Sequence, residues 1–82
     1  MDVYLGLIQA FPYDYVPMGW LRCEGQILQI VQNQALFSLI GNKFGGDGKT
    51  TFGLPDLRGA EPDPGGLCKY HICVSGLYPI WD

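Results

Sequence analysis

The stretch that most constrains this chain is residues 32–59, which read QNQALFSLIGNKFGGDGKTTFGLPDLRG. Residues 32–40 place apolar side chains on one face at helical spacing, which predicts a helix. Gly41 follows where a left-handed glycine commonly ends a helix. A helix this short is only marginally stable by itself in water, so it must pack on other parts of the chain.

A glycine-rich turn and a short strand follow the predicted helix. Gly45, Gly46 and Gly48 supply positions that tolerate positive φ, so we expect at least one of them to adopt it in a tight reversal. Residues 51–54 then have strand character, and Pro55 stops the strand because it has no backbone N–H. Helix, turn and strand are therefore expected to form one packed unit.

Length and composition predict one small domain covering residues 1–82. A domain of this size buries only about 60% of the surface of its unfolded chain, so its core is thin. Apolar residues make up 48% of the sequence and charged residues 16%, against about 25% charged in an average soluble domain. Such a surface favours self-association. The predicted fold class is α+β, β-rich with one short principal helix, and residues 60–66 form an internal Pro/Gly linker.

Composition also argues against several classes of protein. The longest apolar runs are far below the ~20 residues of a membrane span, so no membrane insertion is expected. The first residues lack the basic region and the cleavage site of a signal peptide, so an extracellular location would require another route of release. The net charge is −3 and the five basic residues are scattered. Nucleic acid is therefore an unexpected partner.

The spacing of the cysteines indicates no clear disulfide or metal-binding pattern. Cys23, Cys68 and Cys73 show no Cys-x-x-Cys spacing, and with the single His71 they make a poor zinc site. One disulfide with one remaining thiol and three free cysteines are both compatible with the sequence. We expect no metal and no cofactor.

The remaining periodic segments predict strands at residues 3–10, 21–23 and 70–74. Residues 3–10 are apolar on both faces, which predicts a strand that is either central in its sheet or covered by a second subunit. Residues 21–30 are typical of a hairpin with its turn at 24–26. The 70–74 strand alternates in the manner of a half-buried strand.

No motif indicates an enzyme. The GGDGKTT segment resembles a phosphate-binding loop, but Lys43 stands where that loop needs its first glycine. Asp47 and Asp56 lack the repeated oxygen ligands of a calcium loop, so a plain turn is predicted. His71 is expected to be exposed or hydrogen-bonded on a strand face, without a catalytic partner.

Several segments together resemble the phage tail collar domain family, which includes short-tail-fibre and microcystin-dependent proteins. Residues 4–26, YLGLIQAFPYDYVPMGWLRCEGQ, contain the Gly-Trp and Cys-x-Gly-Gln elements of that family. Residues 32–59 contain its QNQALFSLLG-type helix, GGDG turn and TFxLPDLRG strand in the same order, and YHICVSGLYP resembles its closing segment. The similarity covers about residues 4–59 and its combination of motifs is highly specific.

The resemblance implies a structural, self-assembling subunit of an extracellular fibre or of a phage-tail-like virion component. The alternative is a trimeric tail-tip module that recognises a cell-surface glycan. Longer members of the family insert a glycine-rich, histidine-bearing region where this chain has only AEPDPGGL. No metal site is therefore transferred from those members.

Two surfaces are candidates for these roles. The first is an oligomer interface at the two apolar chain ends, in a filament by preference or in a trimer. Its residues are Val3, Tyr4, Leu5, Leu7, Ile8, Leu77, Tyr78, Ile80 and Trp81. The second is a possible glycan platform made of Tyr13, Tyr15 and Trp20, although packing beneath their own loop is the commoner role of such aromatics.

Overall fold

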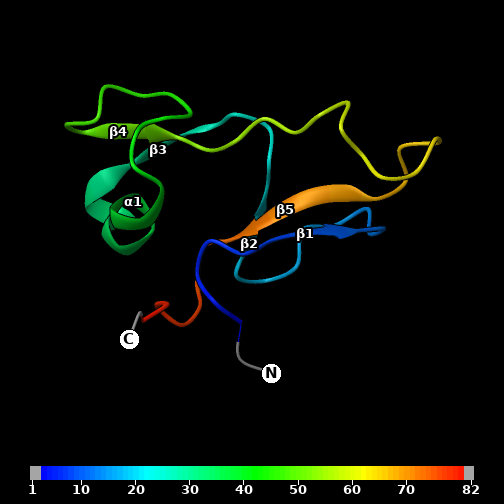
Figure 1. Cartoon of the computed structure of the whole chain (residues 1–82), viewed down its shortest axis with the longest axis horizontal. Coiled ribbons are helices and arrows are strands. Elements are labelled where there is room, and N and C mark those ends of the chain that lie inside the picture. Colours follow the sequence, from blue (N-terminus) through cyan, green and yellow to red (C-terminus); the bar gives the residue numbers. More distant parts are fainter. Residues whose placement is uncertain (1–2, 81–82) are drawn as a thin grey trace.

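A computed structural model of the chain describes residues 3–80. Its elements, in chain order, are β1 (Ile8–Phe11), β2 (Trp20–Arg22), β3 (Ile27–Gln29), the 3-10 helix η1 (Ile30–Gln32), α1 (Gln34–Ile40), β4 (Thr51–Gly53) and β5 (Lys69–Cys73). An antiparallel sheet has the order β1-β5-β2, and β3 and β4 form a second antiparallel sheet (Figure 1). The predicted β-rich α+β class with one principal helix is confirmed.

The principal helix lies inside the predicted range of residues 32–40 and begins at Gln34. The 3-10 helix η1 and then Asn33, at φ −142° and ψ 39°, precede α1. The sequence before this point offers no capping side chain to the helix, and the Asn33 amide donates instead to the Gln29 carbonyl at 3.0 Å. Gly41 ends α1, and its N–H donates to the Phe37 carbonyl at 2.8 Å. Its φ of 64° is positive as expected, but its ψ of −154° is not that of a left-handed helical residue.

The glycine-rich turn folds as predicted. Gly45, Gly46 and Gly48 all have positive φ, at 137°, 82° and 74°. The turn lies directly against β4, because the Gly53 N–H donates to the Gly45 carbonyl at 2.9 Å. Beyond Gly53 the chain leaves the sheet just before Pro55, one residue earlier than predicted.

The predicted strand over residues 3–10 is wrong in its first half, since β1 begins only at Ile8. Gly6 has φ 87°, and the Leu7 N–H bonds the Tyr4 carbonyl at 3.2 Å, so the chain turns here. Gly6 and Leu7 both lie opposite Cys73 in a β-bulge. The Gly6 N–H donates to the Cys73 carbonyl, and the Cys73 N–H donates to the Leu7 carbonyl. Of the two alternatives predicted for this strand, the central position is excluded, because β1 lies at the edge of its sheet. Cover by a second subunit stays a prediction.

The predicted hairpin over residues 21–30 is wrong too. β2 pairs with β5 and β3 pairs with β4, so the two arms belong to different sheets. Between them, Cys23 donates its N–H to the Tyr70 carbonyl and accepts from the Leu57 N–H, both at 2.9 Å. These bonds fix Cys23 in the segment that connects the two sheets, so the chain does not form a hairpin turn here.

Strand β5 is buried on both faces, whereas the alternating pattern predicted one exposed face. His71, Ile72 and Cys73 are all buried. Ile72 belongs to the main core on one face of β5, and on the other face the ring of His71 lies 5.3 Å from the ring of Phe11 in β1. The expectation of an exposed His71 is therefore wrong, while the hydrogen-bonded alternative is confirmed, since Nδ1 lies 2.7 Å from the Lys69 carbonyl.

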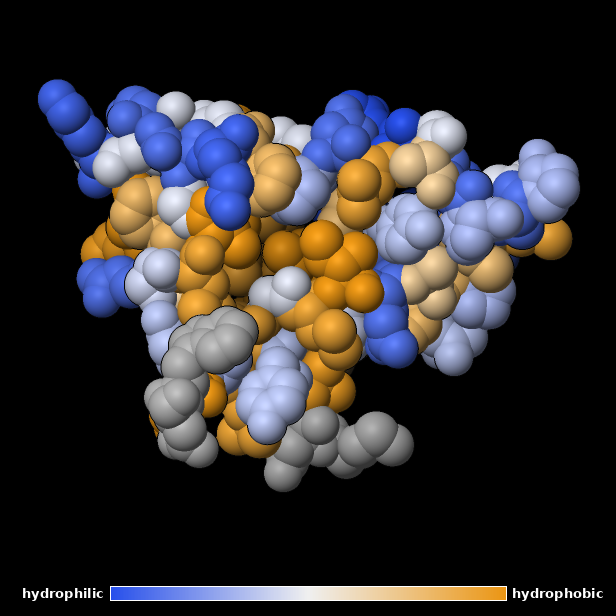
Figure 2. Space-filling view, in the orientation of Figure 1, coloured by the Kyte–Doolittle hydropathy of each residue, from blue (hydrophilic) through white to orange (hydrophobic). Residues whose placement is uncertain are grey.

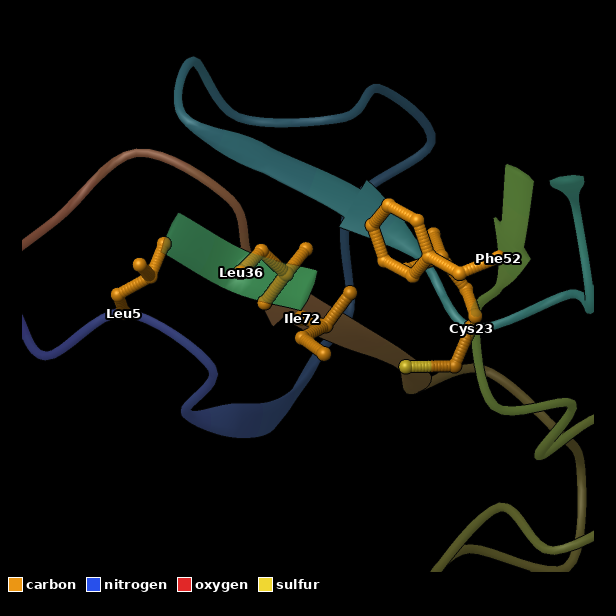
Figure 3. Packing of buried hydrophobic residues seen from close by; sticks show 6 residues of the cluster. Leu5, Cys23, Leu36, Phe52 and Ile72 are labelled. Carbon is orange, nitrogen blue, oxygen red and sulfur yellow. The ribbon is translucent and has the colours of Figure 1, made fainter. Parts of the chain in front are cut away.

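One apolar cluster joins both sheets and the helix (Figure 3). Phe37 of α1 contacts Phe52 of β4 edge-on, with ring centroids 5.4 Å apart. The three cysteines are free, and burial raises the pKa of the Cys23 thiol to about 11. The buried members of the cluster are Leu5, Cys23, Leu36, Phe52, Leu54 and Ile72.

Candidate interaction surfaces

The two ends of the described chain lie side by side (Figure 1). Leu77 pairs with Tyr4 in a parallel bridge. Its N–H donates to the Val3 carbonyl at 2.8 Å, and its carbonyl accepts from the Leu5 N–H at 2.7 Å. The N-terminal turn and the segment after β5 are therefore joined by backbone hydrogen bonds before any side chain is considered.

Two local features hold the C-terminal segment in this place. A Cβ on Gly76 would meet the Val3 carbonyl oxygen and would lie 2.9 Å from the Cys73 sulfur, so only glycine allows this approach. The Ser38 hydroxyl lies 2.7 Å from the Ala35 carbonyl and 2.7 Å from the Tyr78 hydroxyl. Because the carbonyl can only accept, Ser38 donates to it and Tyr78 donates to Ser38, which ties the segment to α1.

We call Tyr4, Leu77, Tyr78 and Ile80 the chain-end surface. These side chains line a hollow of about 470 Å³. Tyr4 is 60% exposed and Ile80 is 86% exposed, and the other two are about half exposed. In the space-filling view, apolar residues gather in the middle of this face and extend towards the chain ends (Figure 2). Among residues 3–80, the chain-end surface is thus an apolar hollow lined by no charged side chain.

The structure divides the predicted interface residues into several groups. Leu7 and Ile8 are exposed, and the Leu7 N–H bonds the carbonyl of Tyr4; Val3 is half-buried. Leu5 is 7% exposed within the main core, so it is not available to a partner and its prediction as an interface residue is wrong. Trp81 lies outside the described residues.

The predicted glycan platform is reduced to two rings. Tyr13 and Tyr15 are exposed and stacked, with centroids 5.2 Å apart and planes at 8°. Phe11 stacks on the other side of Tyr13 at 5.6 Å and 12°. Tyr13 therefore lies between two neighbours, and Tyr15 presents the more accessible ring. Trp20 is half-buried and meets Phe11 edge-on at 4.9 Å, so it supports the stack from within.

Beneath this stack lie a buried histidine and a half-buried arginine, which the sequence did not reveal. His71 and Arg22 are directly opposite on neighbouring strands, and Phe11 lies 5.3 Å from the His71 ring. The Arg22 Nη2 donates to the Asp14 carbonyl at 3.0 Å, which fastens the loop to β2. The alternation Phe-Pro-Tyr-Asp-Tyr at residues 11–15 was the available signal that Phe11 belongs with the two tyrosines.

The glycine-rich turn is stabilised by its own acidic residue. The Asp47 carboxylate accepts hydrogen bonds from the N–H groups of Lys49, Thr50 and Thr51 at 2.8 to 3.0 Å, and from the Thr50 hydroxyl at 3.0 Å. These bonds hold the pKa of Asp47 well below its ordinary value. Backbone donors that a phosphate would need are thus already occupied by a carboxylate.

A second exposed carboxylate is paired with a guanidinium. Arg58 donates through Nε and Nη2 to the two oxygens of Asp56, at 2.9 and 2.7 Å. This bidentate contact, together with a hydrogen bond from the Arg58 backbone N–H, lowers the pKa of Asp56 to about 2. Both side chains are solvent-exposed, so the pair orients the chain after β4 more than it stabilises the fold.

Within residues 3–80, no cluster of three or more His, Cys, Asp or Glu side chains is arranged to hold a metal ion. In the same range, no helix has both the length and the apolarity that a bilayer crossing requires.

The sequence profile of the phage tail collar domain matches residues 6–62, which is more than half of the chain. The chain belongs to this family. The curated proteins compared with it include no match. The phage tail collar domain is a structural family of tail fibres, and membership makes this collar domain a tail component of a virion.

The match and the fold have different boundaries. The loop of residues 12–19, called the aromatic loop below, falls within residues 6–62, as do α1, the glycine-rich turn and β4. Strand β5 and Leu77, Tyr78 and Ile80 follow that range, yet β5 is the central strand of the larger sheet. This collar domain is therefore completed by a strand and an apolar segment from outside the matched region.

Proposed function

We propose that this collar domain is a self-assembling structural subunit of an extracellular fibre or phage-tail-like particle. Its copies contact one another through the chain-end surface, with Leu7 and Ile8 beside it. The observation that carries the proposal is the gathering of four large, exposed, uncharged side chains around one hollow. Exposed apolar patches of this kind commonly mark sites of protein association.

The size of the surface limits what it can do alone. Full burial of a large apolar side chain contributes about 1.5–3 kcal/mol. Ile80 is almost fully exposed and the other three are roughly half exposed, so their burial together contributes about 4–8 kcal/mol. Association of two proteins costs at least about 4 kcal/mol in lost freedom. The chain-end surface therefore supports assembly in combination with a second contact.

A double substitution tests this role. Tyr4→Ser with Ile80→Ser is expected to abolish assembly into particles larger than a dimer while leaving the thermal midpoint nearly unchanged, because both side chains project into solvent. The matched control is Met18→Ser, which removes a 99% exposed apolar side chain from the aromatic loop. Mass is measured by light scattering across a concentration series, and negative-stain electron microscopy separates filaments from closed trimers.

Two results would contradict the proposal. One is an unmodified protein that stays monomeric at high concentration. The other is a double variant that assembles as well as the Met18→Ser control.

A second candidate function is recognition of a cell-surface glycan, and the exposed stack of Tyr13 and Tyr15 favours it. Aromatic rings offer flat apolar faces that suit the C–H faces of sugars. Tyr15→Ala is then expected to abolish retention on immobilised cell-surface glycans. Tyr4→Ala, which removes an equally exposed tyrosine elsewhere, is expected to retain it. Equal retention by both variants, or none by the unmodified protein, excludes this function.

A further inference from the structure

Strand β1 leaves one row of backbone groups without a partner. The Cys73 N–H donates to the Leu7 carbonyl at 2.8 Å, which sets the phase of the β1-β5 ladder. In an antiparallel ladder, alternate residues turn their backbone groups towards the neighbouring strand. Gln9 and Phe11 therefore face β5, and Ile8 and Ala10 face away from it. Among the described residues, no group hydrogen-bonds to the backbone of Ile8 or Ala10 on that outer side.

The other strand edges are already partly engaged. On β2, the Trp20 N–H bonds the Pro17 carbonyl at 3.1 Å. On β3, the Gln29 carbonyl accepts from the Asn33 side chain at 3.0 Å. On β4, the glycine-rich turn occupies Gly53 and Thr51. Within residues 3–80, β1 thus offers two successive outward residues with both donor and acceptor free.

We propose that β1 pairs antiparallel with β1 of a second copy of this chain, about a two-fold axis at Gln9. In this register, Ile8 exchanges both backbone bonds with Ala10 of the second copy, and Ala10 does the same with its Ile8. The pairing uses all four free groups at once. A shift by two residues in either direction leaves some of them unpaired, so this register is favoured.

The side chains of the edge suit a copy of itself. Residues 7–11 contain no ionisable side chain, so symmetric pairing brings no like charges together. The register places Leu7 beside Phe11 of the second copy on one face, and Ile8 beside its Ala10 on the other. Natural edge strands are commonly protected by a charge or a proline, and β1 has neither between Ile8 and Phe11.

This contact deepens the proposed self-assembly and rests on it. A two-fold contact by itself closes a dimer, whereas two different contacts on one subunit link copies into a chain. Leu7 directly precedes the free edge, and its N–H bonds the carbonyl of Tyr4, which belongs to the chain-end surface. The β1 pairing therefore supplies the second contact that the chain-end surface requires, and alternation of the two contacts builds a filament.

Cysteine cross-linking tests the axis directly. Gln9→Cys is placed in a Cys68→Ser background, because Cys68 is the half-buried native thiol while Cys23 and Cys73 are buried. Cβ atoms of a non-hydrogen-bonded antiparallel pair lie about 4.5–5.5 Å apart, close to the spacing of a disulfide. Mild oxidation is expected to give a covalent dimer. Ala10→Cys is the control, because its copies lie about 8 Å apart in this register and cannot be bridged.

A proline substitution tests the backbone bonds. Ala10→Pro removes an N–H that points away from β5, so the internal ladder keeps its bonds and the strand tolerates proline. Introduced into the Gln9→Cys protein, it is expected to abolish the cross-linked dimer, whereas Ala10→Ser leaves it unchanged. A circular dichroism melt of each variant establishes that the monomer remains folded.

The outcomes separate this inference from the proposed function. Assembly that persists without a Gln9→Cys cross-link, or with Ala10→Pro present, overturns the β1 pairing and leaves the chain-end proposal standing. A cross-linked dimer that survives Tyr4→Ser with Ile80→Ser, in a protein that no longer forms larger particles, supports both. Cross-linking of the Ala10→Cys control at the same rate shows random collision and overturns the inference.

Discussion

Gly46 provides the sharpest test of how the turn is built. Its φ is 82°, and a Cβ at this position would meet the Phe52 Cα and lie 2.6 Å from the Phe52 nitrogen. Those atoms belong to β4, and Phe52 is fully buried, so the strand cannot move away without disturbing the core. Gly59 has a similar φ of 89°, but nothing lies within 4 Å of its Cβ position. The two glycines therefore separate the cost of positive φ from the cost of a clash.

The expected costs follow from this geometry. Gly59→Ala is expected to lower the free energy of unfolding by about 1–2 kcal/mol, the cost of positive φ for a residue with a Cβ. Gly46→Ala carries the same cost plus about 1–3 kcal/mol for overpacking against backbone. The free energies are measured by urea denaturation at pH 7. For a domain of this size, each kcal/mol corresponds to a shift of roughly 4–8 °C in the thermal midpoint.

The comparison also gives a clear refutation. If the two variants lose equal free energy of unfolding, the close approach of the turn to β4 does not constrain the fold. If Gly59→Ala loses more than Gly46→Ala, the assignment of the turn glycines to a steric role is wrong.

Two further predictions concern electrostatics and the core. The pKa of Asp47 is lowered in the folded state, so its stabilising effect is complete above the unfolded-state pKa of about 4 and is lost as the pH falls below it. Asp47→Asn is therefore expected to destabilise the protein at pH 7 and to reduce the loss of stability between about pH 5 and 2. Part of that loss remains in the variant, because the pKa of Asp56 is also lowered. The free energy of unfolding is measured by urea denaturation at each pH, and an unchanged dependence on pH would contradict the role of Asp47. Leu36→Ala is expected to cost about 2–5 kcal/mol, because Leu36 is 1% exposed at the centre of the apolar cluster; Val31→Ala, at a 73% exposed position, is expected to stay within about 0.5 kcal/mol, and similar thermal midpoints for the two variants would refute this placement of the core.

The sequence alone predicted the features that depend on neighbouring residues. Gly41 ends a helix, the three glycines after it have positive φ, and Pro55 follows a short strand, as the local pattern required. Each of these features is set by the backbone freedom of one or two residues. The order of the same motifs was enough to place the chain in its family.

The candidate surfaces were predicted only in part. The exposed apolar character of Tyr4, Leu77, Tyr78 and Ile80 was visible as two apolar chain ends, but their meeting around one hollow was not. Leu5 belonged to the same apolar run and is nevertheless buried, because Gly6 turns the chain and directs Leu5 inwards. A pattern of apolar residues does not distinguish a core side chain from an interface side chain.

Strand pairing was decided only by the tertiary structure. Residues 21–30 had the local pattern of a hairpin, yet β2 pairs with β5 and β3 with β4, partners distant along the chain. The same pairing puts β5 in the centre of its sheet, buries His71 and leaves β1 at an edge. Backbone hydrogen bonds are alike at every residue, so the sequence predicts that a segment is extended more readily than it predicts the strand that it meets. That choice depends on how all apolar faces are covered at once, and this condition is met only in the complete fold.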